Sequence, residues 1–256
     1  DVYKRQVVGK VKVERLVRLA EGTDIKVAVD NPKNVRELSE AASEYGVEIG
    51  VLVEVDVGMR RCGVPPGKPT LKLAEEVLRS GGLKFKGLMG YEGHCVMMES
   101  FKERVKECRK ANKLLVDTAR MLEDAGIDVE IVSAGGTGTY NITGNYPGIT
   151  EVQAGSYATM DLRYRGVEGV GETFQCAVTV LATVISRPTG DRAIIDTGMK
   201  AITMEFGLPQ PKGLEGVELV GLSEEHGRLK LESPRIGLDV GDKIELILTH
   251  GCTTIN

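Results

Sequence analysis

The sequence lacks several features from which the function of a chain is often recognised. It has no apolar run of transmembrane length and no apolar core of a signal peptide near its start. Its five cysteines are scattered and odd in number, which argues against a disulfide framework and indicates a reducing compartment, so we expect a cytoplasmic protein. Basic and acidic residues are interspersed and the formal net charge is −4, so neither nucleic acid nor a membrane is an expected partner.

What is present is the composition of an ordinary globular protein. With 256 residues, 41% of them hydrophobic, and 32 glycines, the chain can form a barrel together with a smaller domain. Short β-branched runs alternate with amphipathic helices through the first part, which predicts parallel β/α units. The expected strands are 25–30, 50–56, 85–91, 129–133 and 151–158, and the expected helices are 13–19, 33–45, 70–78 and 98–125.

The periodicity changes after Gly171 to strands and turns. We expect strands at 174–186, 193–196, 217–222, 228–231 and 243–248, which together indicate a separate β-rich domain. The boundary is expected among Gly166, Gly169 and Gly171, which gives a partial (β/α) barrel over 7–168 and a β domain over 169–256. Residues 1–6 read as the translation of a sequencing adapter, so we expect them to be non-native and the chain to be a fragment of a longer protein.

Two glycine-rich turns follow expected strands. Residues 129–140 run from a strand into Ala-Gly-Gly-Thr-Gly-Thr, and residues 153–157 read Gln-Ala-Gly-Ser-Tyr. Adjacent glycines let several backbone N–H groups point at one anion, and loops after the last two strands of parallel barrels often bind phosphate. A pair of tight turns without a ligand is the alternative.

Two further loops carry polar groups past strand ends. Arg61 lies in the Gly-Met-Arg-Arg-Cys-Gly segment 58–63, where a guanidinium can hold a phenolate or carboxylate, whereas we expect Arg60 to be solvated. The segment 90–94 offers Tyr91 as an aromatic platform and His94 as a group that titrates near neutrality. His226 lies in a turn between strands and is expected to cap or pack.

The last residues contain a His-x-Cys pair, His250 and Cys252. Residues 242–248, just before the pair, are expected to form a strand, in which residues two apart point to the same face, so we expect imidazole and thiolate to converge on one ion. Two protein ligands are too few for a closed structural zinc site, so such a metal would keep positions open for water or substrate. Simple packing of a cysteine beside a histidine is the alternative.

Taken in order, six segments of the chain resemble the D-threonine aldolase and D-serine dehydratase family, which consists of metal-dependent pyridoxal phosphate enzymes related in fold to alanine racemase. The segments are 55–63, 90–94, 133–137, 153–157, 196–200 and 250–252. The resemblance implies a (β/α)8 TIM-type barrel followed by a C-terminal β-rich domain that delivers the metal. It also implies that about three barrel strands, with the Schiff-base lysine on the first of them, lie upstream of Val7, because Lys10, Lys12 and Lys26 match no family motif.

The resemblance also implies roles for individual residues. The phosphate of pyridoxal 5'-phosphate would be held by Gly136, Thr137, Gly155, Ser156 and Tyr157. Arg61 would lie near the phenolic oxygen of the cofactor, Tyr91 against its ring, and Gln153 near its ring nitrogen, where relatives that racemise carry an arginine. His94 would be the acid/base group beside the substrate hydroxyl, and His250 with Cys252 would bind a divalent metal, zinc or else manganese or magnesium.

Two reactions of a β-hydroxy-D-amino acid suit one such site. Removal of the hydroxyl proton leads to aldol cleavage into glycine and an aldehyde, as in a D-threonine aldolase. Loss of the hydroxyl leads to dehydration, as in D-serine dehydratase or 3-hydroxy-D-aspartate dehydratase. We favour the aldolase in a homodimeric parent protein and expect residues 1–256 alone to be inactive. A non-catalytic pyridoxal phosphate-binding protein is the alternative of a different class.

Overall fold

The chain divides into two compact units, Asp1–Ala154 and Gly155–Asn256. The structure, a computed structural model, describes residues 6–255. The expectation for residues 1–6 therefore falls outside the described part except for Gln6, which forms a parallel β-bridge with Ala28.

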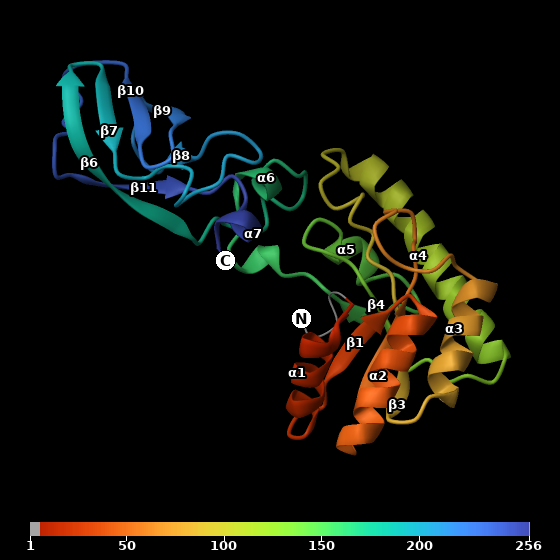
Figure 1. The fold of residues 1–256 in the computed structure, drawn as a ribbon. Coiled ribbons are helices and arrows are strands. Elements are labelled where there is room, and N and C mark those ends of the chain that lie inside the picture. The colour runs from red at the N-terminus through yellow and green to blue at the C-terminus, as the bar shows by residue number, and fades with distance from the viewer. Residues whose placement is uncertain (1–5, 256) are drawn as a thin grey trace. The chain divides into compact units, whose positions relative to one another are not determined.

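The first unit is a parallel sheet with helices between its strands (Figure 1). The strands follow one another in space as they do in sequence, β1-β2-β3-β4-β5. Sequential order requires every crossover to run in the same direction, as in a (β/α) barrel and unlike a doubly wound sheet. The strands are β1 (Lys26–Val29), β2 (Ile49–Glu54), β3 (Leu83–Met89), β4 (Ile131–Ala134) and β5 (Glu151–Val152), and the helices are α1 (Lys10–Ala20), α2 (Pro32–Tyr45), α3 (Lys68–Arg79), α4 (Phe101–Asp124) and α5 (Tyr140–Thr143).

Local sequence explains where the longer helices begin and end. Asn31 caps α2 by accepting the Lys33 N–H at 2.8 Å, and Pro32 occupies the first helical position, where no N–H is needed. Gly46 ends the same helix in the left-handed conformation at φ 66°. Ser100 caps α4 in the same way as Asn31 caps α2. These signals explain why the expected helices lie close to the observed ones.

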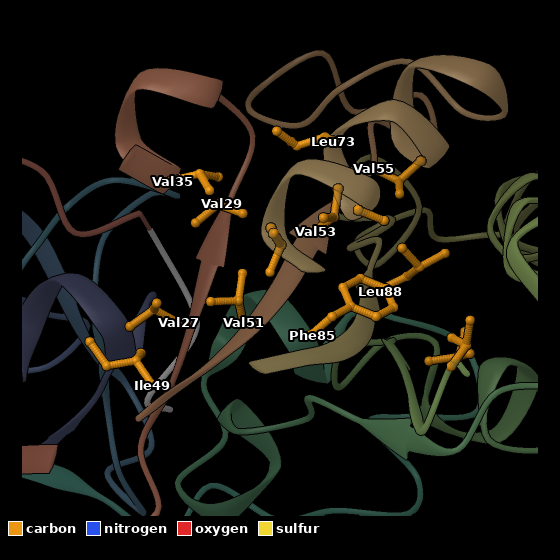
Figure 2. Close-up of a cluster of buried hydrophobic side chains, with 14 of the residues drawn as sticks. Val27, Val29, Val35, Ile49, Val51, Val53, Val55, Leu73, Phe85 and Leu88 are labelled. Carbon is orange, nitrogen blue, oxygen red and sulfur yellow. The ribbon is translucent and has the colours of Figure 1, made fainter. Parts of the chain in front are cut away.

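The core of the first unit lies between the helices and one face of the sheet. Figure 2 shows strand residues such as Val29 and Val53 with helix residues such as Val35 and Leu73, which belong to one buried apolar cluster. Each aliphatic or aromatic side chain buried there contributes about 1.5–3 kcal/mol relative to an exposed one. The helices are thereby fixed on the strands, and the strand ends that carry the loops are fixed with them.

The opposite face of this sheet carries a smaller apolar cluster. Ala28, Leu52 and Met89 are buried there, with Tyr91 and Ile131 packed against them. Side chains alternate along a strand, so the same face continues two residues further toward the carboxyl ends, where polar side chains such as Glu54 lie. A polar layer at the carboxyl ends of the strands is the usual place for the chemistry of barrel enzymes.

The second unit contains a six-stranded sheet in the order β8-β11-β6-β7-β10-β9, paired antiparallel throughout. Its strands show the alternation of buried and exposed side chains that one covered face requires, as in Gly227–Leu231. Its core includes Val184, Ile195, Leu229 and Leu246. The strands are β6 (Thr179–Thr189), β7 (Arg192–Ile195), β8 (Gln210–Pro211), β9 (Val217–Leu222), β10 (Gly227–Leu231) and β11 (Lys243–Ile247), with short helical segments η1 (Ser156–Ala158), α6 (Leu162–Arg165) and α7 (Gly251–Thr254).

The strand expected over 151–158 is too long. β5 ends at Val152, and Ser156–Ala158 form a 3-10 turn instead. The neighbouring strand β4 is short, and its last bond to this segment runs from the Gln153 N–H to the Ala134 carbonyl at 2.9 Å. Beyond that bond the segment has no strand to pair with, so the chain turns.

The expectation that His250 and Cys252 share a strand face is also wrong. β11 ends at Ile247, and Gly251–Thr254 form one helical turn with His250 at its N-cap. The carbonyls of Leu248 and Thr249 accept the N–H groups of Leu162 and Arg163, which draws the tail away from the sheet. These same bonds tie residues 156–165 to the tail and explain why the division falls at Ala154, earlier than the glycines 166–171.

None of the helices in residues 6–255 is long and apolar enough to cross a membrane.

Candidate active site

The loop after β2 brings Arg61 to Tyr91. The Arg61 guanidinium carbon lies 5.3 Å from the centroid of the Tyr91 ring, and Nη2 lies 3.8 Å from Oε1 of the buried Glu54. The loop is held by Asp56, whose carboxylate accepts the N–H groups of Gly58 and Arg60 at 3.0 Å each. Burial raises the pKa of Glu54. The structure thus places a cation, an aromatic ring and a buried carboxyl group at the ends of adjacent strands.

The loop after β3 places His94 against the loop after β2. A side chain at Gly58 would put its Cβ 3.2 Å from Cε1 of His94, so the ring occupies the space left by that glycine. His94 is exposed, which leaves its ring accessible to a ligand. Arg61, Tyr91 and His94, which the sequence predicted separately, therefore lie in loops that touch one another.

Glu92, between these residues, is a functional candidate that the sequence did not single out. Its side chain is fully buried. One carboxylate oxygen accepts the hydroxyls of Thr139 at 2.7 Å and Thr143 at 2.6 Å, and the other accepts the Gly135 N–H at 2.9 Å. A further contact comes from α4, where Sγ of Cys108 lies 3.7 Å from the same carboxylate. Glu92 fastens the turn to the loop that carries His94.

The glycine-rich turn itself passes close to both neighbouring loops. A Cβ at Gly138 would lie 1.7 Å from the Val96 carbonyl oxygen, and one at Gly136 would lie 3.2 Å from Cε2 of Tyr91. The sequence led us to expect Gly136 to help to hold a phosphate. In the structure its N–H donates to Thr139 Oγ1 at 3.0 Å and is therefore already engaged. The Gly138 N–H has no acceptor among residues 6–255. Thr137, beside it, is buried.

A chain of hydrogen bonds on the inner face of the sheet orients Gln153. Ser133 donates its hydroxyl to Glu151 at 2.5 Å and accepts from Nε2 of Gln153 at 2.9 Å. Because an ionised carboxylate only accepts, the hydroxyl hydrogen goes to Glu151, and the Gln153 amide must face Ser133 with its nitrogen. The carbonyl oxygen of Gln153 is left as an acceptor. Burial raises the pKa of Glu151.

In the second unit, the segment after Ala154 opens a short turn. The N–H groups of Gly155 and Ser156 have no acceptor in the described part of the chain, and nothing lies within 4 Å of a Cβ built on Gly155. Tyr157 packs its ring against Phe174, with the centroids 5.6 Å apart. The Ser156 hydroxyl lies 3.8 Å from Sγ of Cys252, which joins this turn to the C-terminal tail.

The tail is held by contacts that the sequence did not reveal. The His250 ring bonds through Nδ1 to Oε2 of Glu205 at 2.7 Å and packs on the Phe206 ring at 5.0 Å between centroids. Asp161, itself buried, accepts the Gly251 N–H at 3.0 Å. The hydrogen bond from His250 lowers the pKa of Glu205. Cys252 is exposed.

No group of three or more His, Cys, Asp or Glu side chains with the geometry of a metal site occurs among the described residues. His250 and Cys252 are only two candidate ligands, so a metal bound by them would keep its remaining positions for water and substrate. Nothing in the sequence marked Glu205 or Glu92, because both depend on residues far away along the chain. The one sequence signal for Glu92 is its position inside the 90–94 segment, between Tyr91 and His94.

Comparisons with known proteins agree with this architecture. Residues 4–162 match the family described as alanine racemase, N-terminal domain, and residues 177–256 match the family described as putative serine dehydratase domain. D-threonine aldolase from an Arthrobacter species is 37% identical over 258 residues, which cover 100% of this chain and 68% of that protein. The 3-hydroxy-D-aspartate aldolase of Paracoccus denitrificans is 34% identical, over 96% of this chain and 65% of that protein.

Solved structures give the same picture. The crystal structure of D-threonine aldolase from Filomicrobium marinum superposes with a TM-score of 0.92 at 36% identity, covering 97% of this chain and 68% of that one. A D-threo-3-hydroxyaspartate dehydratase with a cysteine replaced by alanine, in the metal-free form, gives a TM-score of 0.82 at 26% identity, covering 96% and 71%. A variant of that dehydratase with a histidine replaced, two positions before the cysteine, is similar to the same extent.

The fold is therefore that of the alanine racemase-like proteins, a parallel α/β unit followed by an antiparallel β unit. The chain belongs to the D-threonine aldolase and D-serine dehydratase family within that class. The relatives are named as aldolases and dehydratases, which are lyases. The chain spans about two thirds of their length, from 65% to 71%.

Proposed function

We propose that the protein is a pyridoxal phosphate- and divalent metal-dependent lyase that cleaves β-hydroxy-D-amino acids into glycine and an aldehyde, as a D-threonine aldolase does. The observation that carries the proposal is the 37% identity to such an aldolase along the whole chain. The relatives are longer than this chain, which covers 68% and 65% of two of them, so we propose the activity for the whole protein.

Each unit carries backbone groups that suit an anion. In the first unit the Gly138 N–H lacks an acceptor among the described residues, and in the second unit the N–H groups of Gly155 and Ser156 do. A phosphate supplies acceptors for such groups. Gly155 leaves open space, and Gly136 lets the turn approach Tyr91 closely. Gly136 therefore contributes space rather than a hydrogen bond.

The residues around Tyr91 fit an aromatic cofactor ring. Tyr91 is half-buried and presents an aromatic surface, and the Arg61 guanidinium beside it would bind an anionic phenolic oxygen. Gln153 has a carbonyl oxygen free to accept, since its amide nitrogen is engaged by Ser133. An acceptor beside a ring nitrogen would favour the form in which that nitrogen carries hydrogen.

The tail fits a divalent cation. His250 and Cys252 offer an imidazole nitrogen and a thiolate, which suit zinc and leave coordination positions open for a substrate hydroxyl. A related dehydratase in which a cysteine is replaced by alanine is known in a metal-free form.

Bound pyridoxal phosphate would supply an electron sink, and a bound cation would polarise the substrate hydroxyl. The side chains of this protein do the remainder. His94, exposed in its loop, would accept the hydroxyl proton, while Arg61 and Tyr91 keep the cofactor ring in one orientation. Lys10 and Lys12 lie on α1, and Lys26 pairs with Asp24 at 2.7 Å, so none of the three lies at the carboxyl end of a strand as a Schiff-base lysine would.

Dehydration of the same substrates is the second candidate. The His-x-Cys pair favours it, because residues 177–256 match a putative serine dehydratase domain and a related dehydratase has a histidine and a cysteine at the same spacing. Product analysis on the whole protein distinguishes the two reactions. Glycine and acetaldehyde from D-threonine support the aldolase, and pyruvate with ammonia from D-serine supports the dehydratase.

The alternative of a non-catalytic protein can be distinguished from both the aldolase and the dehydratase by experiment. If the whole protein gives no product from either amino acid and its absorption spectrum does not shift on addition of pyridoxal phosphate, the proposed lyase is wrong. The same addition to residues 1–256 alone tests the expectation that this chain lacks the lysine. A covalent shift there would contradict that expectation.

A further inference from the structure

His250 has a carboxylate partner that neither the sequence nor the family roles assigned. Oε2 of Glu205 lies 2.7 Å from Nδ1 of His250, whereas the next neighbour of that nitrogen, the Thr253 hydroxyl, lies 3.4 Å away. The two residues are far apart along the chain, and both belong to the second unit. The contact therefore depends on how the 203–206 segment folds against the tail.

The 203–206 segment holds the tail at several points. The Thr249 hydroxyl donates to the Thr203 carbonyl at 3.2 Å, and the Thr203 N–H donates to the Thr254 hydroxyl at 3.4 Å. The Thr254 hydroxyl in turn donates to the His250 carbonyl at 3.0 Å. Both the backbone and the ring of His250 are thus anchored to one short segment.

Aromatic packing restrains the ring in the same place. The centroids of the Phe206 and His250 rings lie 5.0 Å apart, at an interplanar angle of 55°. The guanidinium carbon of Arg163 lies 5.7 Å from the centroid of the same Phe206 ring. The His250 side chain is only 14% exposed, although Glu205 is 43% exposed. The imidazole is therefore held by its neighbours rather than free on the surface.

We propose that Glu205 is the positioning residue of His250, fixing the imidazole with hydrogen on Nδ1 so that Nε2 presents its lone pair to the divalent cation. A carboxylate only accepts hydrogen bonds, so the nitrogen that faces it carries the hydrogen. Histidines that bind metals commonly donate their other ring N–H to a carboxylate, which sets the tautomer and raises the basicity of the ligating nitrogen. The metal part of this inference depends on the proposed function, but the tautomer part does not.

The tautomer is measured without metal or cofactor. The chain has three histidines, so ¹⁵N spectra of the imidazole rings at alkaline pH contain few signals, and His250→Gln identifies one of them. We expect neutral His250 to carry its hydrogen on Nδ1 in the wild-type chain and to lose that preference in Glu205→Ala. Glu205→Gln, whose amide oxygen still accepts, should restore the preference. An unchanged His250 tautomer in Glu205→Ala would overturn the inference.

Zinc affinity, measured by competition with a chromophoric chelator, gives the second readout. Removing such a carboxylate partner should weaken zinc binding by about ten- to hundred-fold. The matched control is Glu225→Ala, which removes a carboxylate of the same unit that pairs with Lys200 at 2.6 Å, and it should bind zinc as the wild type does. Equal affinity in Glu205→Ala and the wild type would mean that Glu205 forms only a surface ion pair.

The two readouts separate this inference from the proposed function. If His250→Ala binds zinc as tightly as the wild type, the metal does not bind at His250 and the metal part of the proposed function fails. The tautomer measurement then still decides whether Glu205 orients the ring. Circular dichroism spectra of each variant show whether the fold is retained.

Discussion

The two units hold their candidate site residues in different ways. In the first unit, Tyr91 and the glycine-rich turn follow strands that are buried between helices and an inner apolar layer, and the fully buried Glu92 ties them together. In the second unit, His250 and Cys252 follow the last strand of a sheet and are held by side chains of Asp161 and Glu205. The first arrangement resembles a rigid core site and the second a tail held by a few specific bonds. A few substitutions should therefore loosen the second without unfolding it, whereas comparable changes in the first should reduce the stability of the whole unit.

The largest expected effect is that of Glu92→Ala. It leaves the Gly135 N–H and two threonine hydroxyls without their buried acceptor, and each buried group left unsatisfied costs about 1–3 kcal/mol. Native-state hydrogen exchange at the amides of β3 and β4 measures the loss. Glu123→Gln, an exposed change on α4, is the control. A loss below about 1 kcal/mol would show that the first unit does not depend on this carboxylate.

Gly138→Ala should come next. The added Cβ would lie 1.7 Å from the Val96 carbonyl oxygen, so the turn must move away from the loop after β3. We expect a loss of about 2–3 kcal/mol, in the range of overpacked sites, together with weaker binding of pyridoxal phosphate. Gly22→Ala, where no atom lies within 4 Å of the added Cβ, should leave both unchanged. Cofactor affinity equal to wild type in Gly138→Ala would argue against this turn as a phosphate site.

Asp161→Ala should have a smaller and more local effect. The Gly251 N–H and the Tyr164 N–H lose a buried acceptor, which costs about 1–3 kcal/mol. Because these bonds anchor the tail rather than the sheet, faster hydrogen exchange and proteolysis should be confined to residues near 161–166 and 249–255. Glu215→Ala, an exposed change in the same unit, is the comparison. Equally increased exchange throughout the strands of the second unit would remove the distinction between the two units.

The smallest expected effects concern pH. Burial raises the pKa of Glu151 in the first unit, so its contribution to stability is present below its unfolded pKa and is lost as pH rises through the folded value. Hydrogen bonds from Lys212 and Thr179 lower the pKa of Glu245 in the second unit, so its contribution is present above the unfolded pKa and is lost as pH falls through the folded value.

Glu151→Gln and Glu245→Gln should therefore change the pH dependence of stability in opposite directions. Glu151→Gln should flatten the loss on raising the pH above about 4.5, the ordinary value, and Glu245→Gln should flatten the loss on lowering it below that value. Urea unfolding of each variant at several pH values measures both slopes. Slopes that change in the same direction would contradict the two pKa shifts.

Much of the fold could be predicted because it depends on local patterns. The caps at Asn31 and Ser100 and the β-branched runs of the strands are readable within a few residues of sequence, and the helices and strands appear near their expected places. The expected strand 174–186 is displaced, since β6 spans Thr179–Thr189. Two other errors share one cause, which is the choice of pairing partner. Residues 156–158 looked like strand until the structure showed that β4 ends too early to pair with them, and residues 250–252 looked like a strand continuation until Leu162 and Arg163 took the tail carbonyls.

By itself, the sequence determined the parallel and antiparallel units, the family, and the residue types at the site, because motif order and hydrophobic periodicity are properties of the chain. Only the tertiary structure decided that Arg61 lies over Tyr91, that Glu92 holds the glycine-rich turn, and that Glu205 faces Nδ1 of His250. Each of these contacts joins residues separated by other elements, and a hydrogen bond or ion pair exists only where packing brings its two atoms within about 3–4 Å.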